Sequence, residues 1–203
     1  MKRSCAALVM ILGLALGLQA QEKKPATVAF SEPALGERGT SRILYWDQEK
    51  NVAVGELTVN FGRPVWKKEY DDPAAFGQAT RGRVWRLGDN YWTVLDTNVP
   101  LKIAGQDVPV GLWYLGLYRA PDGASWSLAF IDPAKARKTR LDPFAINGAP
   151  VEFKVPMASA SAPELTEKLT ISLTPQKEEI KNVTLKISWG HVQLTAPVRV
   201  SLE

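Results

Sequence analysis

Alternation of apolar and polar residues is the feature of this 203-residue chain that most restricts its fold. The clearest case lies near the C-terminus, where every second residue is apolar: Val192, Leu194, Ala196, Val198, Val200 and Leu202. Residues 169–174 and 183–189 alternate in the same way. Because successive side chains of a strand point to opposite faces of a sheet, each segment is typical of a half-buried strand. The sequence therefore predicts a three-stranded meander, with breaks at residues 175–179 and at the Gly190-His191 pair.

Shorter alternating segments, with turn residues between them, occupy the middle of the chain. The predicted strands there are residues 42–47, 52–61, 100–103, 108–110, 112–118 and 125–131. A helical turn or two is predicted at Pro73–Thr80 and at Pro133–Lys138, and the small residues of 156–163 are typical of a loop. Many short strands without alternating helices predict an all-β fold. We expect a single antiparallel β-sandwich, with a β-barrel as the alternative architecture.

Residues 1–20 have the three parts of a secretory signal peptide. Lys2 and Arg3 form a basic start, residues 6–18 form an apolar run, and Ala20 provides a small residue for cleavage. The apolar run is shorter than the roughly 20 residues that a helix needs to cross a bilayer, so a membrane anchor fits less well. We predict cleavage after Ala20, which leaves a single mature domain, residues 21–203, in the periplasm or secreted.

Cys5 is the only cysteine of the chain, and it lies within the predicted signal peptide. The mature domain would therefore contain no thiol for a disulfide, a cysteine nucleophile or a thiolate metal site. Cys5 also precedes the apolar run, whereas a lipid-modified cysteine follows it. We therefore expect no stable membrane anchor after cleavage.

The charge balance gives no support to nucleic acid as a partner. The formal net charge is +4, of which Lys2 and Arg3 supply two, so the predicted mature domain carries +2. This charge is too small to indicate an electrostatic footprint for nucleic acid. The basic cluster of the chain consists of Lys135, Arg137, Lys138 and Arg140. We interpret it as a solvated loop, with a phosphate-binding patch as the alternative.

The residues that often serve catalysis or metal binding form no specific pattern. His191 is the only histidine, and we interpret it as a turn or surface residue, since a zinc site needs three or four matched ligands. No metal and no cofactor are predicted. Five aspartates lie in the central region, and most of them are interpreted as turn and cap residues: Asp71, Asp72, Asp89, Asp96 and Asp107. A pair of them that hydrolyses glycosides is the alternative, because such enzymes use two carboxyl groups.

Seven tryptophans are many for a chain of this length. Trp113 and Trp126 fall within alternating strands, and we expect them in the core. Trp66 and Trp92 lie beside charged or polar residues, and we expect these two rings at the surface. Exposed aromatic rings can stack on sugars, so a glycan is one ligand that the composition suggests.

Arginine and amide or carboxylate side chains concentrate in residues 61–64 and 81–90. Guanidinium groups bind carboxylates and phosphates through paired hydrogen bonds, so these segments suggest a pocket for a small anion. The predicted binding residues are Arg63, Arg83, Arg86, Asp89, Asn90 and Trp92. The alternative is a structural network in which Arg86 pairs with Asp89 above a packed tryptophan.

The same segments resemble a family of exported bacterial proteins catalogued as domain of unknown function 2911. The resemblance is carried by Phe61-Gly62-Arg63-Pro64, Phe76-Gly77, Val84-Trp85-Arg86-Leu87-Gly88-Asp89-Asn90, Ala104-Gly105, Pro109-Val110-Gly111-Leu112-Trp113 and Ile187-Ser188-Trp189. It spans roughly residues 55–202. The family pattern has tyrosine in place of Phe61, and alanine and glutamate in place of Asp89 and Tyr91. The resemblance implies export and a β-rich fold, and it implies no reaction.

The sequence leaves three functions open. The leading hypothesis is a non-enzymatic exported protein that binds a small anionic ligand, a glycan or an envelope protein around Arg63, Arg86 and Asn90. The second is a hydrolase of envelope polysaccharide that uses Asp72 and Asp89. The third is a structural or assembly module. A solvent-accessible concavity beside the predicted binding residues would favour the first hypothesis.

Overall fold

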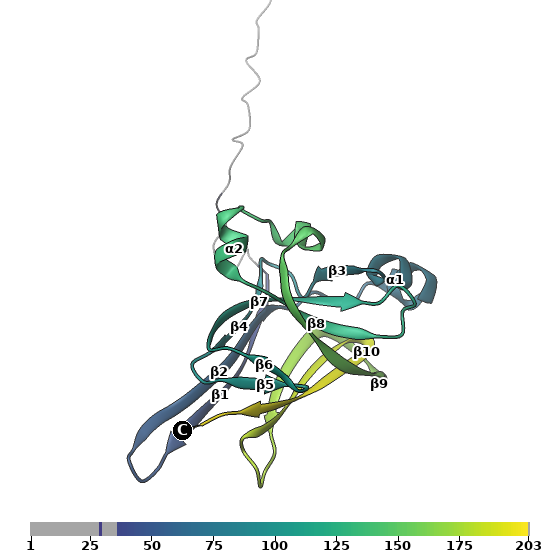
Figure 1. The fold of residues 1–203 in the computed structure, drawn as a ribbon. Helices are drawn as coiled ribbons and strands as arrows, with labels where there is room; N and C mark the ends of the chain where they lie inside the picture. Colours follow the sequence, from purple (N-terminus) through teal and green to yellow (C-terminus); the bar gives the residue numbers. More distant parts are fainter. Residues whose placement is uncertain (1–28, 30–35, 203) are drawn as a thin grey trace, which may run out of the picture. The chain divides into compact units, whose positions relative to one another are not determined.

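Antiparallel β-strands account for most of the structure, a computed structural model that describes Ala29 and residues 36–202 (Figure 1). The strands are β1 (Arg38–Asp47), β2 (Val52–Gly62), β3 (Arg83–Arg86), β4 (Thr93–Thr97), β5 (Leu101–Ile103), β6 (Gln106–Val108), β7 (Gly111–Arg119), β8 (Trp126–Ile131), β9 (Val151–Pro175) and β10 (Asn182–Val200). The helical segments are the 3-10 helices η1 (Lys68–Asp71) and η2 (Pro143–Gly148) and the α-helices α1 (Pro73–Thr80) and α2 (Pro133–Lys138). The predicted signal peptide, its cleavage after Ala20, and Cys5 lie outside the described residues.

The strands pair in the order β1-β2-β4-β7-β8-β9-β10-β5-β6, and β3 pairs with β7 beyond the end of β4. The long strand β9 joins the two parts of this sheet, because its first residues pair with β8 and its later residues pair with β10. The sheet therefore folds over along β9 into two packed layers, and it does not close into a barrel. The first layer contains β1, β2, β3, β4, β7, β8 and the start of β9, and the second contains the rest of β9 with β10, β5 and β6. This arrangement confirms the predicted all-β, sandwich-like fold and not the barrel alternative.

Two predicted interruptions of the C-terminal strands are wrong. Residues 156–163, predicted as a loop, lie within β9, and the Gly190-His191 pair lies within β10. The register between β9 and β10 shifts on both sides of Gly190, whose φ of 59° is a left-handed conformation that glycine adopts easily. Gly190 therefore forms a bulge through which β10 continues. The small residues of β9 stay extended because they pair with β10, as Ser159 does with Leu194.

The main hydrophobic core lies between the two layers. Trp126, Leu128 and Phe130 of β8 point into it and are buried, as their alternation predicts. Ala129 and Ile131 point the opposite way, into a smaller core beneath α2 and η2. Strand β8 is therefore covered on both faces, whereas a plain two-layer sandwich would leave one face in water.

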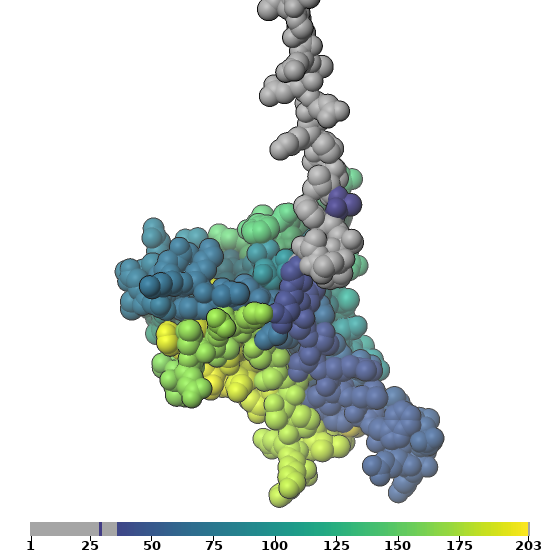
Figure 2. Space-filling model, turned by 180° about the vertical axis from the view of Figure 1, so that it is seen from behind, coloured from purple at the N-terminus to yellow at the C-terminus, as the bar shows by residue number. Residues whose placement is uncertain are grey.

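The β1–β2 hairpin and the β9–β10 hairpin lie side by side (Figure 2). Tyr45 Oη of β1 donates a 3.0 Å hydrogen bond to the carbonyl oxygen of Ile180, in the turn after β9. Nearer the start of β1, Ser41 Oγ accepts a 2.9 Å hydrogen bond from the backbone N–H of Leu173 in β9. These bonds hold β1 against β9, so the outer strand of the first layer is partly covered.

Both predicted helical turns are confirmed as α1 and α2, and an aspartate followed by proline begins each of them. Asp72 caps α1 by accepting a 2.9 Å bond from the N–H of Ala74, which confirms its interpretation as a cap residue. The basic cluster lies on α2 and just after it, exposed to solvent, and not in a loop as predicted. In the described part of the chain, no helix is long and apolar enough to span a membrane.

Candidate functional site

A cavity of about 270 Å³ lies beside the edge of β3 that is not paired with β7, where α1 meets the two layers. Tyr70, Trp85 and Trp189 form an aromatic wall, and Arg86 and Lys67 are its cationic residues. We term this hollow the β3 cavity. Trp85, Arg86 and Trp189 belong to the sequence elements that carry the family resemblance, so those elements meet at one place in the fold.

The aromatic wall is held by ring packing. The ring centroid of Trp189 lies 5.8 Å from that of Trp85 and 5.7 Å from that of Tyr70. Trp66 supports the wall from behind, with its centroid 5.0 Å from that of Trp189 in an edge-to-face contact. Such contacts add to the stabilisation from burial, so the wall is preorganised.

The indole N–H groups of this cluster differ in their hydrogen bonding. Trp189 Nε1 donates a 3.0 Å bond to the carbonyl oxygen of Pro64. Trp66 Nε1 donates a 2.8 Å bond to Asp71 Oδ1 in η1. In contrast, Trp85 Nε1 is shielded from solvent and has no acceptor within the described residues. Most buried donors are paired, so Trp85 is the exception among these three indole groups.

Arg86 is half-buried, and burial lowers the pKa of its guanidinium, while Asp89 and Asp142 act in the opposite direction. Its cationic carbon lies 3.9 Å from the centre of the Phe144 ring, in a cation–π contact. Within residues 36–202 the Arg86 guanidinium forms no hydrogen bond or ion pair. The direct pair with Asp89, which the alternative interpretation required, therefore does not form. The guanidinium stays charged, since arginine does not lose its proton in proteins.

Asp89 lies in the loop after β3, against the end of β2. Burial raises the pKa of Asp89, although Arg86 and Arg38 act to lower it, and its Oδ1 is shielded from solvent without a donor in the described part. A methyl group on Gly62 would overlap both the carbonyl oxygen and the carboxylate of Asp89. The glycine after Phe61 is thus required for the close approach of residues 87–92 to β2.

Arg38 fixes this loop, and the sequence analysis missed it. Its guanidinium donates bonds of 2.5 Å to the carbonyl oxygen of Asn90 and 2.9 Å to that of Trp92. The same group donates to Asn60 Oδ1 of β2 at 2.6 and 2.8 Å. The partners of Arg38 are far from it in sequence, and no local pattern indicates them.

The predicted binding residues do not converge on one point. Arg86 lines the β3 cavity, and Arg63 lies next to it, where it forms an ion pair with Glu37 and donates a 3.3 Å bond to the carbonyl oxygen of Leu169. Arg83 is exposed, and its side chain has no bonded partner in the described residues. Asn90 has a left-handed φ of 51° in the loop that Arg38 holds.

The tryptophans predicted at the surface are buried. Trp66 is 9% exposed and Trp92 is 2% exposed, whereas Trp46 is 50% exposed. Trp66 is covered by the aromatic cluster, and Trp92 stacks on Tyr114 at a centroid distance of 4.5 Å. The polar neighbours of these residues in sequence misled the prediction, because Lys67 and Tyr91 are exposed beside a buried ring, and Thr93 is itself buried.

His191 is at the surface, as one part of its interpretation stated, but in strand β10 and not in a turn. Its Nε2 atom lies 3.9 Å from Asp71 Oδ1, which already accepts the bond from Trp66. Nowhere in residues 36–202 do three or more histidine, cysteine, aspartate or glutamate side chains gather as they would around a metal ion.

The sequence comparisons assign a family and no activity. The family model described as "Protein of unknown function (DUF2911)" matches residues 46–198. The chain therefore belongs to this family, which confirms the resemblance found in its sequence elements. No curated protein and no solved structure matches the chain.

Proposed function

We propose that this protein binds a small organic anion with a flat apolar body, and that the β3 cavity is the binding site. One observation carries the proposal: an aromatic wall and the cationic residues Arg86 and Lys67 line the same cavity, and the Arg86 guanidinium has no anionic partner in contact with it in the described chain. Apolar walls with a few convergent polar groups are typical of ligand sites. In this proposal the protein is a binding protein and not an enzyme, and it is exported through residues 1–20.

The chemistry of the cavity favours a carboxylate on an aromatic or similarly flat group. Burial removes water from the Arg86 guanidinium. A carboxylate beside this group would replace that water by accepting charge-assisted hydrogen bonds from it. The flat body would lie on Trp85 and Trp189. The volume is near the lower end of known ligand pockets, about 300 Å³, which favours a compact ligand.

The two other hypotheses gain no support from the positions of their residues. Asp72 uses one carboxylate oxygen to cap α1, and one oxygen of Asp89 is shielded from solvent. No observation in the described chain favours a hydrolase or an assembly module over ligand binding. A glycan remains a ligand to be tested against the anion.

Titration of the purified full chain tests the proposal through its tryptophan fluorescence. The panel contains benzoate and indole-3-acetate, their neutral amides, and short glycans. We expect the carboxylates to bind at least about tenfold more tightly than the amides, because hydrogen bonds to charged groups contribute about 1.5–3 kcal/mol. Tighter binding of a glycan than of every carboxylate would contradict the proposal.

Two arginine variants locate the site. Arg86→Gln should weaken carboxylate binding about tenfold or more, with little change for the amides. Arg83→Gln is the matched control, because Arg83 lies on the same strand but is exposed and does not line the cavity. Unchanged affinity in Arg86→Gln, or no binding of any carboxylate by the parent protein, would overturn the proposal.

A further inference from the structure

A second cavity, of about 260 Å³, lies between α2 and the loop that precedes β4. Tyr91, Trp92, Tyr114, Arg137 and Arg140 contribute to its lining, and we term it the α2 cavity. It shares no lining residue with the β3 cavity. It belongs to the smaller core beneath α2, on the opposite face of the sheet from the main core. The two hollows are therefore separate candidate sites.

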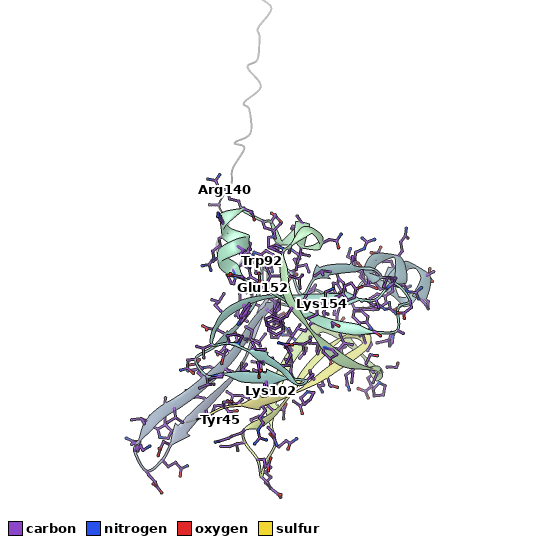
Figure 3. All side chains as sticks on the ribbon, in the orientation of Figure 1. Tyr45, Trp92, Lys102, Arg140, Glu152 and Lys154 are labelled. Atoms are coloured by element: carbon purple, nitrogen blue, oxygen red, sulfur yellow. The ribbon has the colours of Figure 1, made fainter. Side chains whose placement is uncertain are left out.

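The floor of the α2 cavity is a rigid aromatic pair. The rings of Trp92 and Tyr114 are parallel, with centroids 4.5 Å apart. Arg137 Nε donates a 3.1 Å bond to Tyr114 Oη, which places the guanidinium beside the floor and leaves its terminal N–H groups unused. Figure 3 labels Trp92 below α2 and Arg140 at the upper end of this helix.

Neither arginine of the α2 cavity has a carboxylate partner in the described residues. Arg140 forms no side-chain bond there, and the Arg137 guanidinium bonds to the hydroxyl of Tyr114. Asp142 lines the same cavity, but one of its oxygens caps η2 by accepting a 2.7 Å bond from the N–H of Phe144. Two guanidinium groups therefore line the cavity with one carboxylate, and that carboxylate already accepts a hydrogen bond. The summed formal charge of these three side chains is positive.

Capping of α2 does not explain these arginines. Basic residues near a helix C-terminus can bond its last carbonyl groups. Here backbone N–H groups of the following residues already occupy those carbonyls, with distances of 3.3 Å to Lys135, 2.9 Å to Ala136 and 3.0 Å to Arg137. The guanidinium groups are therefore available for a ligand.

Tyr91 adds an independent observation. Its φ of 84° is unfavourable for a bulky residue, and it is 64% exposed at the rim of the cavity. Such a conformation costs about 1–3 kcal/mol and persists only where the surroundings impose it, which occurs often at binding sites. The bonds from Arg38 to Asn90 and Trp92 impose it here. The phenol is thus held at the rim beside the two arginines.

We propose that the α2 cavity binds a phosphomonoester dianion through Arg137 and Arg140. Two guanidinium groups match the two negative charges of the phosphate, and each presents forked N–H donors to its oxygens. The aromatic floor and Tyr91 then contact the group that carries the phosphate. The basic cluster has a phosphate-binding role in this proposal, which does not depend on the function of the β3 cavity.

Calorimetric titration of the full chain with phenyl phosphate and with inorganic phosphate tests the proposal. Arg140→Gln should raise the Kd for phenyl phosphate at least about tenfold. The matched control is Lys138→Gln, an exposed lysine of α2 that does not line the cavity, and it should leave the Kd within roughly a factor of two. Equal weakening by both variants would overturn the proposal, because it would indicate diffuse attraction.

A pH series and a lipid arm make the test sharper. The second ionisation of a phosphate monoester lies near about pH 6, so binding should weaken as the pH falls from about 7.5 to about 5. Sedimentation with vesicles that contain phosphatidic acid would assign the site to a lipid headgroup, and binding of phenyl phosphate alone would assign it to a soluble ester. Absence of binding to phenyl phosphate, inorganic phosphate and the vesicles would overturn the proposal.

Discussion

The β3 cavity and the α2 cavity lie on opposite sides of the first layer and are built in different ways. The β3 cavity joins residues from Pro64 to Trp189, so it exists only when the two layers have packed. The α2 cavity joins residues from Tyr91 to Asp142, which lie in the loop before β4, in β7, in α2 and in the segment after α2. The difference teaches that the aromatic site depends on the packing of both layers, whereas the basic site is built from one layer and the segments attached to it.

The loop of residues 87–92 is common to both cavities. Gly88 lines the β3 cavity, and Tyr91 and Trp92 line the α2 cavity. Contact with Gly62 holds the first half of the loop, and Arg38 holds the second half. Substitutions in and around this loop therefore separate the two sites or damage both.

The largest expected effect comes from Gly62→Ala. The added methyl group would overlap the backbone of Asp89, so the loop must move, and we expect a loss of about 3 kcal/mol in the free energy of unfolding. Urea denaturation measures this loss. Gly148→Ala is the control, since no atom lies within 4 Å of its added methyl group, and it should change stability by less than roughly 0.5 kcal/mol. Similar values for both variants would contradict the role of the close approach.

A pair of tryptophan variants sharpens the description of the β3 cavity alone. Trp66→Phe removes a paired N–H and leaves Asp71 without that donor, so we expect a loss of about 2 kcal/mol. Trp85→Phe removes an N–H that has no acceptor, so its loss should stay below about 1 kcal/mol. Denaturation compares the two. A larger loss in Trp85→Phe would show that its N–H is satisfied in solution.

The smallest expected effect concerns Asp89 in the shared loop and depends on pH. Burial raises the pKa of Asp89, so well below the ordinary pKa of aspartate the carboxyl is protonated in both states and its burial has no electrostatic cost. Stability is then lost as the pH rises through the folded-state pKa, since the native state must bury the charge. Asp89→Asn lacks this loss, so its stability relative to the parent should improve from about pH 3 to about pH 7. A pH-independent difference between the two proteins would contradict this cause.

Much of the fold could be predicted because strand formation has a local signal. The alternation of Trp126, Leu128 and Phe130 decided which side of β8 is buried, and the helical turns predicted at Pro73–Thr80 and Pro133–Lys138 are α1 and α2. The loop predicted at residues 156–163 and the break at Gly190 failed, because pairing between β9 and β10 outweighs local preference.

The candidate sites were less accessible to prediction. The sequence indicated Arg86 through its cluster of polar neighbours, and it placed Trp92 with that residue. The structure separates them, since Arg86 lines the β3 cavity, whereas Trp92 lies in the core beneath α2 and lines the α2 cavity. Arg38 was missed because its bonds cross from β1 to a loop that no local pattern links to it.

The sequence by itself determined the class of fold, the position of most strands and the membership of the family, because side-chain alternation and short sequence elements are local properties. Only the tertiary structure decided which side chains share a cavity. The folding of the sheet along β9 brings Trp189 to Trp85, and the approach of Gly62 to Asp89 sets the loop between the two sites. These contacts join residues far apart in the chain, and their geometry follows from packing, which no local pattern records.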